Sequence, residues 1–315
     1  MTSLIWRLHR NQVWFASAVL VVLAVVLLIT GHVMADDYRN ALANCAATPG
    51  CTNAGNLLFR GDGAIMDIVD LTLVVPLLFG LFWGAPLLAK EFEDGTNSLV
   101  WTQTVTRRRW LSSNVAWALL AAAVWGAAMA ALVSWWRFPE NALGTRFDAF
   151  DIQGIAPAAY SLFAVSLGIA IGSVIKRVLP ALATTLGIFV GLRAVIAIYL
   201  RPHYLTPTKQ VIGIGADPNG PSGAWVISSS IVGPHGQVYG DSFSPSDVPK
   251  ACLQTFFDKQ GISGHCMATH GFHQLVSFQA ANRFWAFQGI EAAIFLVLAA
   301  GLIGFAFWRV LSRDA

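Results

Sequence analysis

Charge is scarce in this chain. Asp, Glu, Lys and Arg make up only 12% of its 315 residues, about half the share found in soluble proteins, while 56% of the residues are hydrophobic. This composition excludes a pair of ordinary soluble domains. Most apolar residues lie in uncharged runs near the roughly 20-residue length that crosses a hydrocarbon core. The sequence therefore predicts a multi-pass membrane protein.

Motifs for nucleotide hydrolysis are also lacking. The chain has no G-x-x-x-x-G-K-[ST] loop, whose backbone amides and lysine cradle ATP phosphates. The nearest glycine-rich stretch, Gly213-Ile-Gly215, lacks the lysine. There is no H-E-x-x-H pair, and the serines have no recognisable nucleophile setting. We therefore expect no catalytic residue and no cofactor in this chain, so that any ATP hydrolysis is supplied by another subunit.

Six hydrophobic runs are long enough to span a bilayer. The first is longer than a usual signal-peptide core and lacks a clear cleavage site, so we expect it to remain in the protein. The second contains Pro76 and Pro86, which predicts a kinked or broken helix. The expected spans are 13–33, 71–89, 114–136, 155–175, 179–200 and 285–308.

Basic residues predict the orientation, because cytoplasmic loops retain Lys and Arg near the span ends. Ten basic residues lie in four short segments on one side, and nine are spread over three longer segments on the other. Both termini are therefore predicted to be cytoplasmic. The fold class expected is an all-α polytopic membrane protein with three regions: 1–200 with the first five helices, an extracellular insertion at 201–282, and 283–315 with the sixth helix.

All four cysteines fall on the predicted outer side. This placement favours disulfides over free thiols, which are unusual outside the cell. Three connectivities are possible, and we favour the local pairs Cys45–Cys51 and Cys252–Cys266. His265, His270 and His273 near Cys266 are potential metal ligands, but we expect Cys266 to be oxidised and predict no metal site.

Two charged residues lie inside predicted spans. Arg193 and Glu291 are each about seven residues from the outer end of their span, or roughly 10 Å deep. Such residues usually pair with each other or line a pathway. We favour an ion pair between spans five and six, with contact to a polar substrate or snorkelling to the surface as alternatives.

The most informative segment is a charged stretch between spans two and three, KEFEDGTNSLVWTQTVTRRRW at 90–110. One interpretation is a solvated loop. The order of its residues favours a folded structure over a solvated loop. Acidic residues come first, Gly95 is suited to end a helix, and Thr96 is suited to cap the next. The arginines that close the segment would anchor span three at anionic headgroups. We therefore predict a helical hairpin at 90–112 on the membrane surface.

This arrangement resembles the ABC-2-type permease family, the transmembrane subunits of ATP-binding-cassette exporters, and is particularly similar to actinobacterial members. In that family an E-x-E-x-G-T pattern follows the second helix and a T-Q-x-V-x-R stretch precedes the third. Both patterns are present here, in Glu91, Glu93, Gly95 and Thr96, and in Thr102, Gln103, Val105 and Arg107.

The resemblance implies a mechanism and partners. The segment would couple the spans to a separate ATPase subunit that binds ATP and Mg. Two permease copies would work with two ATPases, embedded among the lipids of a bacterial plasma membrane, with no role for nucleic acid. The apolar spans favour efflux of a hydrophobic or amphipathic drug, lipid or peptide. The alternatives are a sensor whose extracellular domain binds a ligand, and a membrane-embedded enzyme, which the missing catalytic motifs disfavour.

Overall fold

The computed structural model of the chain describes residues 2–47, 69–95, 106–143, 146–214, 223–239, 247–252 and 264–312. Two compact units divide the chain. Unit 1 comprises Met1–Glu140, Ala149–Ile198 and Trp285–Ala315, and unit 2 comprises Asn141–Asp148 and Tyr199–Phe284. Each unit is described by itself.

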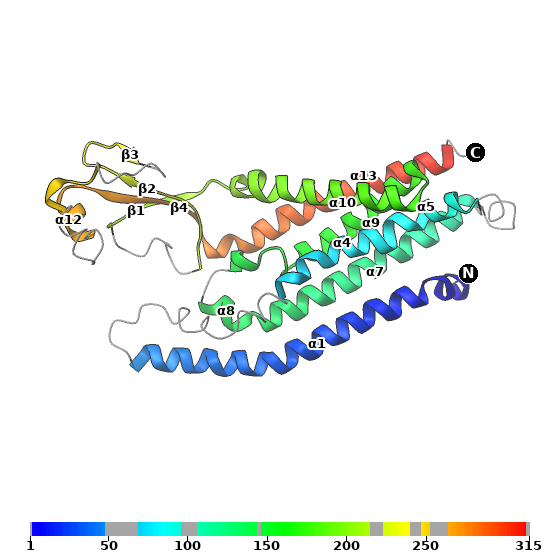
Figure 1. The fold of residues 1–315 in the computed structure, drawn as a ribbon, viewed down its shortest axis with the longest axis horizontal. Helices are drawn as coiled ribbons and strands as arrows, with labels where there is room; N and C mark the ends of the chain where they lie inside the picture. The colour runs from blue at the N-terminus through cyan, green and yellow to red at the C-terminus, as the bar shows by residue number, and fades with distance from the viewer. Residues whose placement is uncertain are drawn as a thin grey trace. The chain divides into compact units, whose positions relative to one another are not determined.

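Unit 1 is a bundle of long helices (Figure 1). Six helices among the described residues are long and apolar enough to cross a membrane, which confirms the predicted number of spans. They are formed by α1 (Thr2–Ala47), the segments from Leu71 to Glu93, α7 (Arg107–Trp136), α9 (Ala156–Ile175), α10 (Val178–Val195) and α13 (Phe284–Ser312).

The first helix is much longer than predicted. α1 contains 46 residues, which makes it roughly 70 Å long at 1.5 Å per residue. It therefore extends well beyond a hydrocarbon core of about 30 Å. The hydropathy pattern predicted that this helix ends at Val33 and that Cys45 lies in the loop after it. That prediction is wrong, because Cys45 lies on the helix.

The second span is broken, as its prolines predicted. It begins with a 3-10 turn, η1 (Leu71–Val74), and continues as α4 (Val75–Phe79), the π-helical segment η2 (Gly80–Gly84) and α5 (Ala85–Glu93). Pro76 and Pro86 lie in the first turns of α4 and α5. Proline has no N–H to donate, so each ring interrupts the regular helical ladder.

The second span packs against α9 along a seam of glycines. Gly80 and Gly84 on η2 face α9 near Gly168, while Gly172 on α9 faces Ala85 of α5. Three residues separate the members of each glycine pair. A Cβ on Gly84 would lie 2.6 Å from the carbonyl oxygen of Val165, and one on Gly168 would lie 2.5 Å from the Ala85 nitrogen. Small residues at this spacing let two helix backbones approach closely in a membrane. α9 is accordingly the most buried span.

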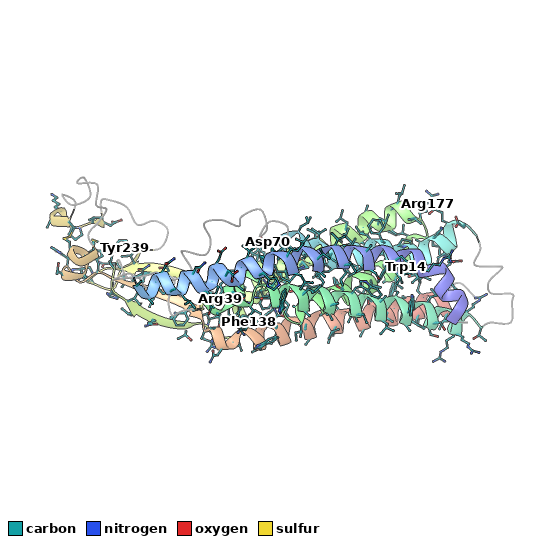
Figure 2. All side chains as sticks on the ribbon, turned by 90° about the horizontal axis from the view of Figure 1, so that it is seen from below. Trp14, Arg39, Asp70, Phe138, Arg177 and Tyr239 are labelled. Atoms are coloured by element: carbon teal, nitrogen blue, oxygen red, sulfur yellow. A yellow bond between two sulfur atoms is a disulfide. The ribbon has the colours of Figure 1, made fainter. Side chains whose placement is uncertain are left out.

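The ends of unit 1 differ in character. α1 begins at the same end of the bundle at which α5 and α13 finish (Figure 1). Figure 2 places Trp14 and Arg177 toward this end, and Asp70, Arg39 and Phe138 toward the other. The starts of α1 and α7, the ends of α5 and α13 and the α9–α10 turn therefore gather at one end, which we call the basic end.

Unit 2 is built around a four-stranded antiparallel sheet in the order β1-β4-β2-β3. Its strands are β1 (Thr208–Ile212), β2 (Trp225–Val232), β3 (Val238–Tyr239) and β4 (His273–Gln279). A small core of Val248, Cys252, Met267 and Phe272 includes part of the short helix α12 (Gly264–Thr269). The all-α class expected for the membrane-spanning part therefore applies to unit 1, and unit 2 adds a β-sheet.

Candidate coupling site and buried polar network

α5 ends at the basic end with a defined cap. The helix finishes at Glu93, and the N–H of Asp94 donates to the carbonyl of Lys90 at 2.9 Å. Gly95 follows with φ 67°, the left-handed conformation that glycine adopts at helix C-termini without strain. The prediction that Gly95 ends a helix is confirmed. Glu91 is half-buried and Glu93 is exposed.

Glu93 connects α5 to the turn between α9 and α10. Its Oε2 accepts a hydrogen bond from the N–H of Val178, the first residue of α10, at 2.8 Å. A free N–H at the start of a helix is one of four that need a partner, and an acid there also matches the helix dipole. Glu93 thus acts as a cap supplied by a different helix.

The turn itself is held by a second contact with α5. Lys176 has φ 56° and ends α9 in the left-handed conformation, which is uncommon for a residue with a Cβ. Its ammonium group lies over the ring of Phe92, 4.7 Å from the centroid, a cation–π distance. Residues 92 and 93 therefore contact both sides of the two-residue turn at 176–177.

The remaining residues of the predicted hairpin are partly described. α7 begins at Arg107 after Thr106, which is extended. The helix is continuous to Trp136, so the arginines are its first turn. Thr96, Thr102 and Gln103 lie outside the described residues.

A second feature of unit 1 is a buried polar network around Arg193 and Glu291. The sequence predicted an ion pair between these two residues, but the structure pairs Arg193 with another acid. Arg193 pairs with Asp151, with 2.7 Å between Nη2 and Oδ1. Its guanidinium lies 3.9 Å from the centroid of the Tyr160 ring. The Tyr160 hydroxyl lies 2.5 Å from Oε1 of Glu291 and 3.1 Å from Oδ1 of Asp151. Tyr160 therefore connects Glu291 to the Arg193–Asp151 ion pair.

This network is expensive to bury, and its contacts compensate for the cost. Glu291 is only 1% exposed and Tyr160 is fully buried. A charged group at this depth is tolerated when it is paired and hydrogen-bonded. Phe295 packs edge-on against the Tyr160 ring at 4.9 Å, so the polar atoms are enclosed by aromatic side chains.

Gln288, which the sequence analysis missed, ties α13 to the start of α9. Its Oε1 accepts hydrogen bonds from the N–H groups of Ile155 and Ala156 at 3.0 and 2.8 Å, and its Nε2 donates to the carbonyl of Phe150 at 2.8 Å. The side chain is fully buried. A sequence signal was available, because Gln288 and Glu291 are three residues apart and share one helix face.

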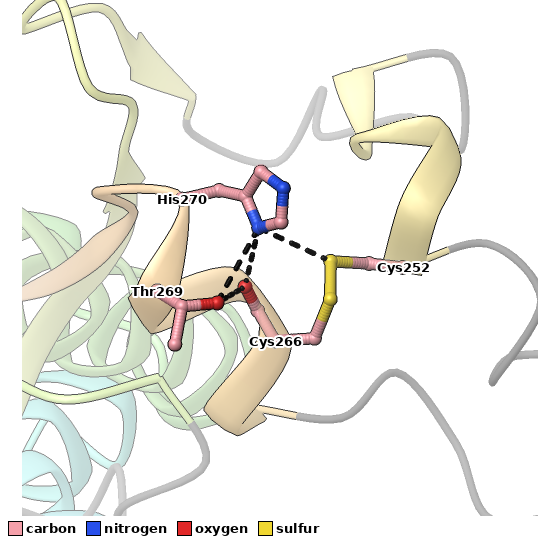
Figure 3. The surroundings of a disulfide bond; sticks show 4 residues. All are labelled: Cys252, Cys266, Thr269 and His270. Carbon is pink, nitrogen blue, oxygen red and sulfur yellow. Dashed lines mark hydrogen bonds between the residues drawn. A yellow bond between two sulfur atoms is a disulfide. The ribbon is translucent and has the colours of Figure 1, made fainter.

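The disulfide of unit 2 joins Cys252 and Cys266, as predicted, with 5.8 Å between the Cα atoms (Figure 3). His270 Nδ1 lies 3.8 Å from the Cys252 sulfur and 2.9 Å from the Cys266 carbonyl oxygen. The ligand-capable atoms of these three residues lie within 4.8 Å of one another. Both sulfurs are committed to the disulfide, and a thiolate is the form that binds metal. Cys45 is also disulfide-bonded, and its predicted partner Cys51 lies outside the described residues.

Comparison with known proteins adds one finding. The family model described as ABC-2 membrane transporter related matches residues 17–201, which is more than half of the 315 residues. The match contains the second span, the charged segment and the α9–α10 turn. No curated protein and no solved structure gives a significant match.

Proposed function

Because this chain belongs to the ABC-2 membrane transporter related family, we propose that it is the permease subunit of an ATP-binding-cassette exporter. The resemblance predicted from the charged segment is confirmed, and the chain is a multi-pass integral membrane protein of an ABC-type system. Membership implies an ABC ATPase partner. In our proposal two copies of the chain work with two ATPase subunits, which bind ATP and Mg, while this chain performs no catalysis.

The contact between Glu93 and Val178 carries the proposal. The ATPase would dock at the basic end, against the segment that begins at Glu91 and continues through the predicted hairpin. Movement of α5 would be passed to α10 because Glu93 caps that helix and Phe92 contacts Lys176 in the turn before it.

Further contacts extend this connection through unit 1. The second span and α9 are packed backbone to backbone at Gly84 and Gly168, so neither moves far without the other. α9 is tied to α13 by Gln288 and approaches α10 through the ring of Tyr160 beneath Arg193. Such close-packed contacts favour discrete rearrangement over gradual deformation. A change at the basic end would thus reach the polar network.

The proposed cargo is hydrophobic or amphipathic. It would enter from the cytoplasm or inner leaflet between two copies of the chain, and ATP binding would drive its release on the other side. The abundance of apolar side chains that face outward from unit 1, such as Val22, Ile29 and Val297, suits a substrate that arrives through the lipid phase.

Co-purification tests the proposal. The full chain would be isolated with mild detergent from its native host, and associated proteins would be identified by mass spectrometry. We expect an ATPase with a Walker-A loop and no membrane spans, in equal copy number. A complex without any ATPase would overturn the proposal. Efflux that requires ATP would then distinguish an exporter from the alternative of a sensor, in which the disulfide-bonded unit 2 binds a ligand.

A further inference from the structure

Unit 1 contains a cavity between α1, the second span and α7. Its volume is about 540 Å³, within the range of small-molecule sites. The lining is made of apolar side chains, including Leu20, Leu23, Phe79, Phe82, Trp83 and Trp125. Four of the eleven lining residues are aromatic, and no charged residue contributes to the lining.

The shape of the cavity follows from the glycine seam. Gly80 and Gly84 turn the side-chain-free face of η2 toward α9, so the larger residues of this segment point to other faces. Trp83 packs edge-on against Trp125 of α7 at 5.9 Å and beside Phe79 at 4.9 Å. These aromatic side chains form one wall of the cavity. α1 closes the opposite side with the aliphatic residues Leu20 and Leu23.

Depth and access indicate what the cavity holds. Trp83 is ten residues before the end of α5 at Glu93, which is roughly 15 Å along a helix and close to the middle of a 30 Å hydrocarbon core. Phe82 is 61% exposed and Val19 is 46% exposed, so the rim opens on the outer surface of the bundle. At this depth the neighbouring solvent is the hydrocarbon of lipid chains.

The cavity suits a narrow and flexible occupant, because its space of about 540 Å³ lies between three helical segments and is enclosed only in part. A flexible hydrocarbon chain fits the space, because it is narrow and bends to follow the cavity. The aromatic wall gives such a chain more contact than disordered lipid does.

We propose that this cavity is a binding site for the hydrocarbon chain of an amphiphile, held between α1 and the Phe79–Trp83 segment. The binding claim stands on the geometry alone; the identification of the bound chain as part of the cargo rests on the proposed function. Both a resident membrane lipid and a transported amphiphile carry such a hydrocarbon chain.

Photolabelling tests the site in the full chain. The protein would be placed in lipid nanodiscs that contain a trace of phospholipid with a diazirine in one acyl chain, and adducts would be mapped by mass spectrometry. We expect adducts concentrated on Val75–Trp83 and Trp125–Met129. Leu20→Trp fills the cavity and should lower this labelling about tenfold, the factor that corresponds to 1.4 kcal/mol. Leu23→Trp provides a second filling variant.

Val22→Trp is the matched control, because Val22 is on α1, is 63% exposed and does not line the cavity. It should leave the labelling unchanged, and all variants should elute as a single species. Adducts spread evenly over outward-facing residues, or labelling indifferent to both filling variants, would overturn the proposal. So would cross-linking of a second copy at these positions in place of lipid adducts.

Two further comparisons complete the test. One distinguishes a resident lipid from cargo as the source of the bound chain, and the other distinguishes failure of the binding site from failure of the exporter assignment. In nanodiscs to which the ATPase subunit has been added, labelling that stays constant when ATP turns over identifies a resident lipid, whereas labelling that falls during turnover identifies cargo. The first nanodisc experiment contains no ATPase, so site-specific adducts in it would survive a failure of the exporter assignment. Conversely, ATP-driven efflux that Leu20→Trp leaves intact, together with unspecific labelling, would remove only the site.

Discussion

Glu93 of α5 accepts a hydrogen bond from the backbone N–H of Val178, at the first position of α10, over 2.8 Å. The two residues are 85 positions apart in the sequence. A single carboxylate therefore links the end of the second span to the start of the fifth. In our account this link is the route by which an ATPase at the basic end moves the spans.

Removal of this cap should loosen the start of α10. Glu93→Ala is expected to accelerate hydrogen exchange of the Val178 amide by roughly two- to tenfold, the effect of losing a cap of about 0.5–1.4 kcal/mol. Glu93→Gln keeps an acceptor oxygen and should show a smaller change. Asp94→Ala is the control, since Asp94 is equally exposed. Equal exchange rates in Glu93→Ala and Asp94→Ala would show that the contact is absent in the membrane.

The glycine seam should not tolerate a methyl group. In Gly84→Ala the new Cβ would lie 2.6 Å from the Val165 carbonyl oxygen, which forces the two backbones apart. We expect a loss of about 1–3 kcal/mol, typical of overpacking, measured by unfolding in mixed detergent micelles with SDS. Gly191→Ala on α10 is the control, because no atom lies within 4 Å of its Cβ position. A Gly84→Ala protein as stable as Gly191→Ala would contradict the seam.

Loss of Gln288 should be costly for the bundle. Gln288→Leu leaves the N–H of Ala156 without this acceptor and the carbonyl of Phe150 without this donor, both of them in buried hydrogen bonds, at about 1–3 kcal/mol for each group. The same SDS unfolding assay should report a decrease of at least about 2 kcal/mol. Gly289→Ala, on the same helix with open space around its Cβ position, should be neutral. Unchanged stability in Gln288→Leu would show that other donors and acceptors replace the side chain.

The Arg193–Asp151 ion pair should show coupling in a double-mutant cycle. Asp151→Ala leaves the Arg193 side chain, which is 11% exposed, without its carboxylate, and we expect a loss of about 1–3 kcal/mol. This is less than for a fully buried pair because Asp151 is 29% exposed. Arg193→Met alone should also destabilise, and the double variant should recover part of the sum. Additive losses would mean that the two residues do not interact.

Hydropathy, prolines and Gly95 made much of unit 1 predictable. The six spans follow from the lengths of the apolar runs, and the break in span two follows from Pro76 and Pro86. Gly95 indicates a helix end because its φ of 67° suits glycine. These features depend on local sequence alone. The Cys252–Cys266 pair was also predictable, since its members are only 14 positions apart in the sequence.

Contacts between distant segments could not be predicted in the same way. The sequence places Arg193 and Glu291 at similar depth, but the partner of Arg193 is Asp151, which precedes α9 and carries no hydropathy signal. The Glu93–Val178 contact depends on how α5 and α10 meet. The spacing of Gly80 with Gly84 and of Gly168 with Gly172 was a readable signal for close helix packing, although it does not say which helices pair.

The most direct test of the account is ATP-dependent transport by the co-purified complex in proteoliposomes, compared with the Glu91→Ala/Glu93→Ala variant. We predict that the variant still binds its ATPase and that ATP hydrolysis continues, while efflux of an amphipathic probe per ATP hydrolysed falls at least about tenfold, a change of 1.4 kcal/mol in coupling. Asp94→Ala should transport normally. Unchanged efflux per ATP in the double variant would contradict the assignment of the end of α5 as the coupling element.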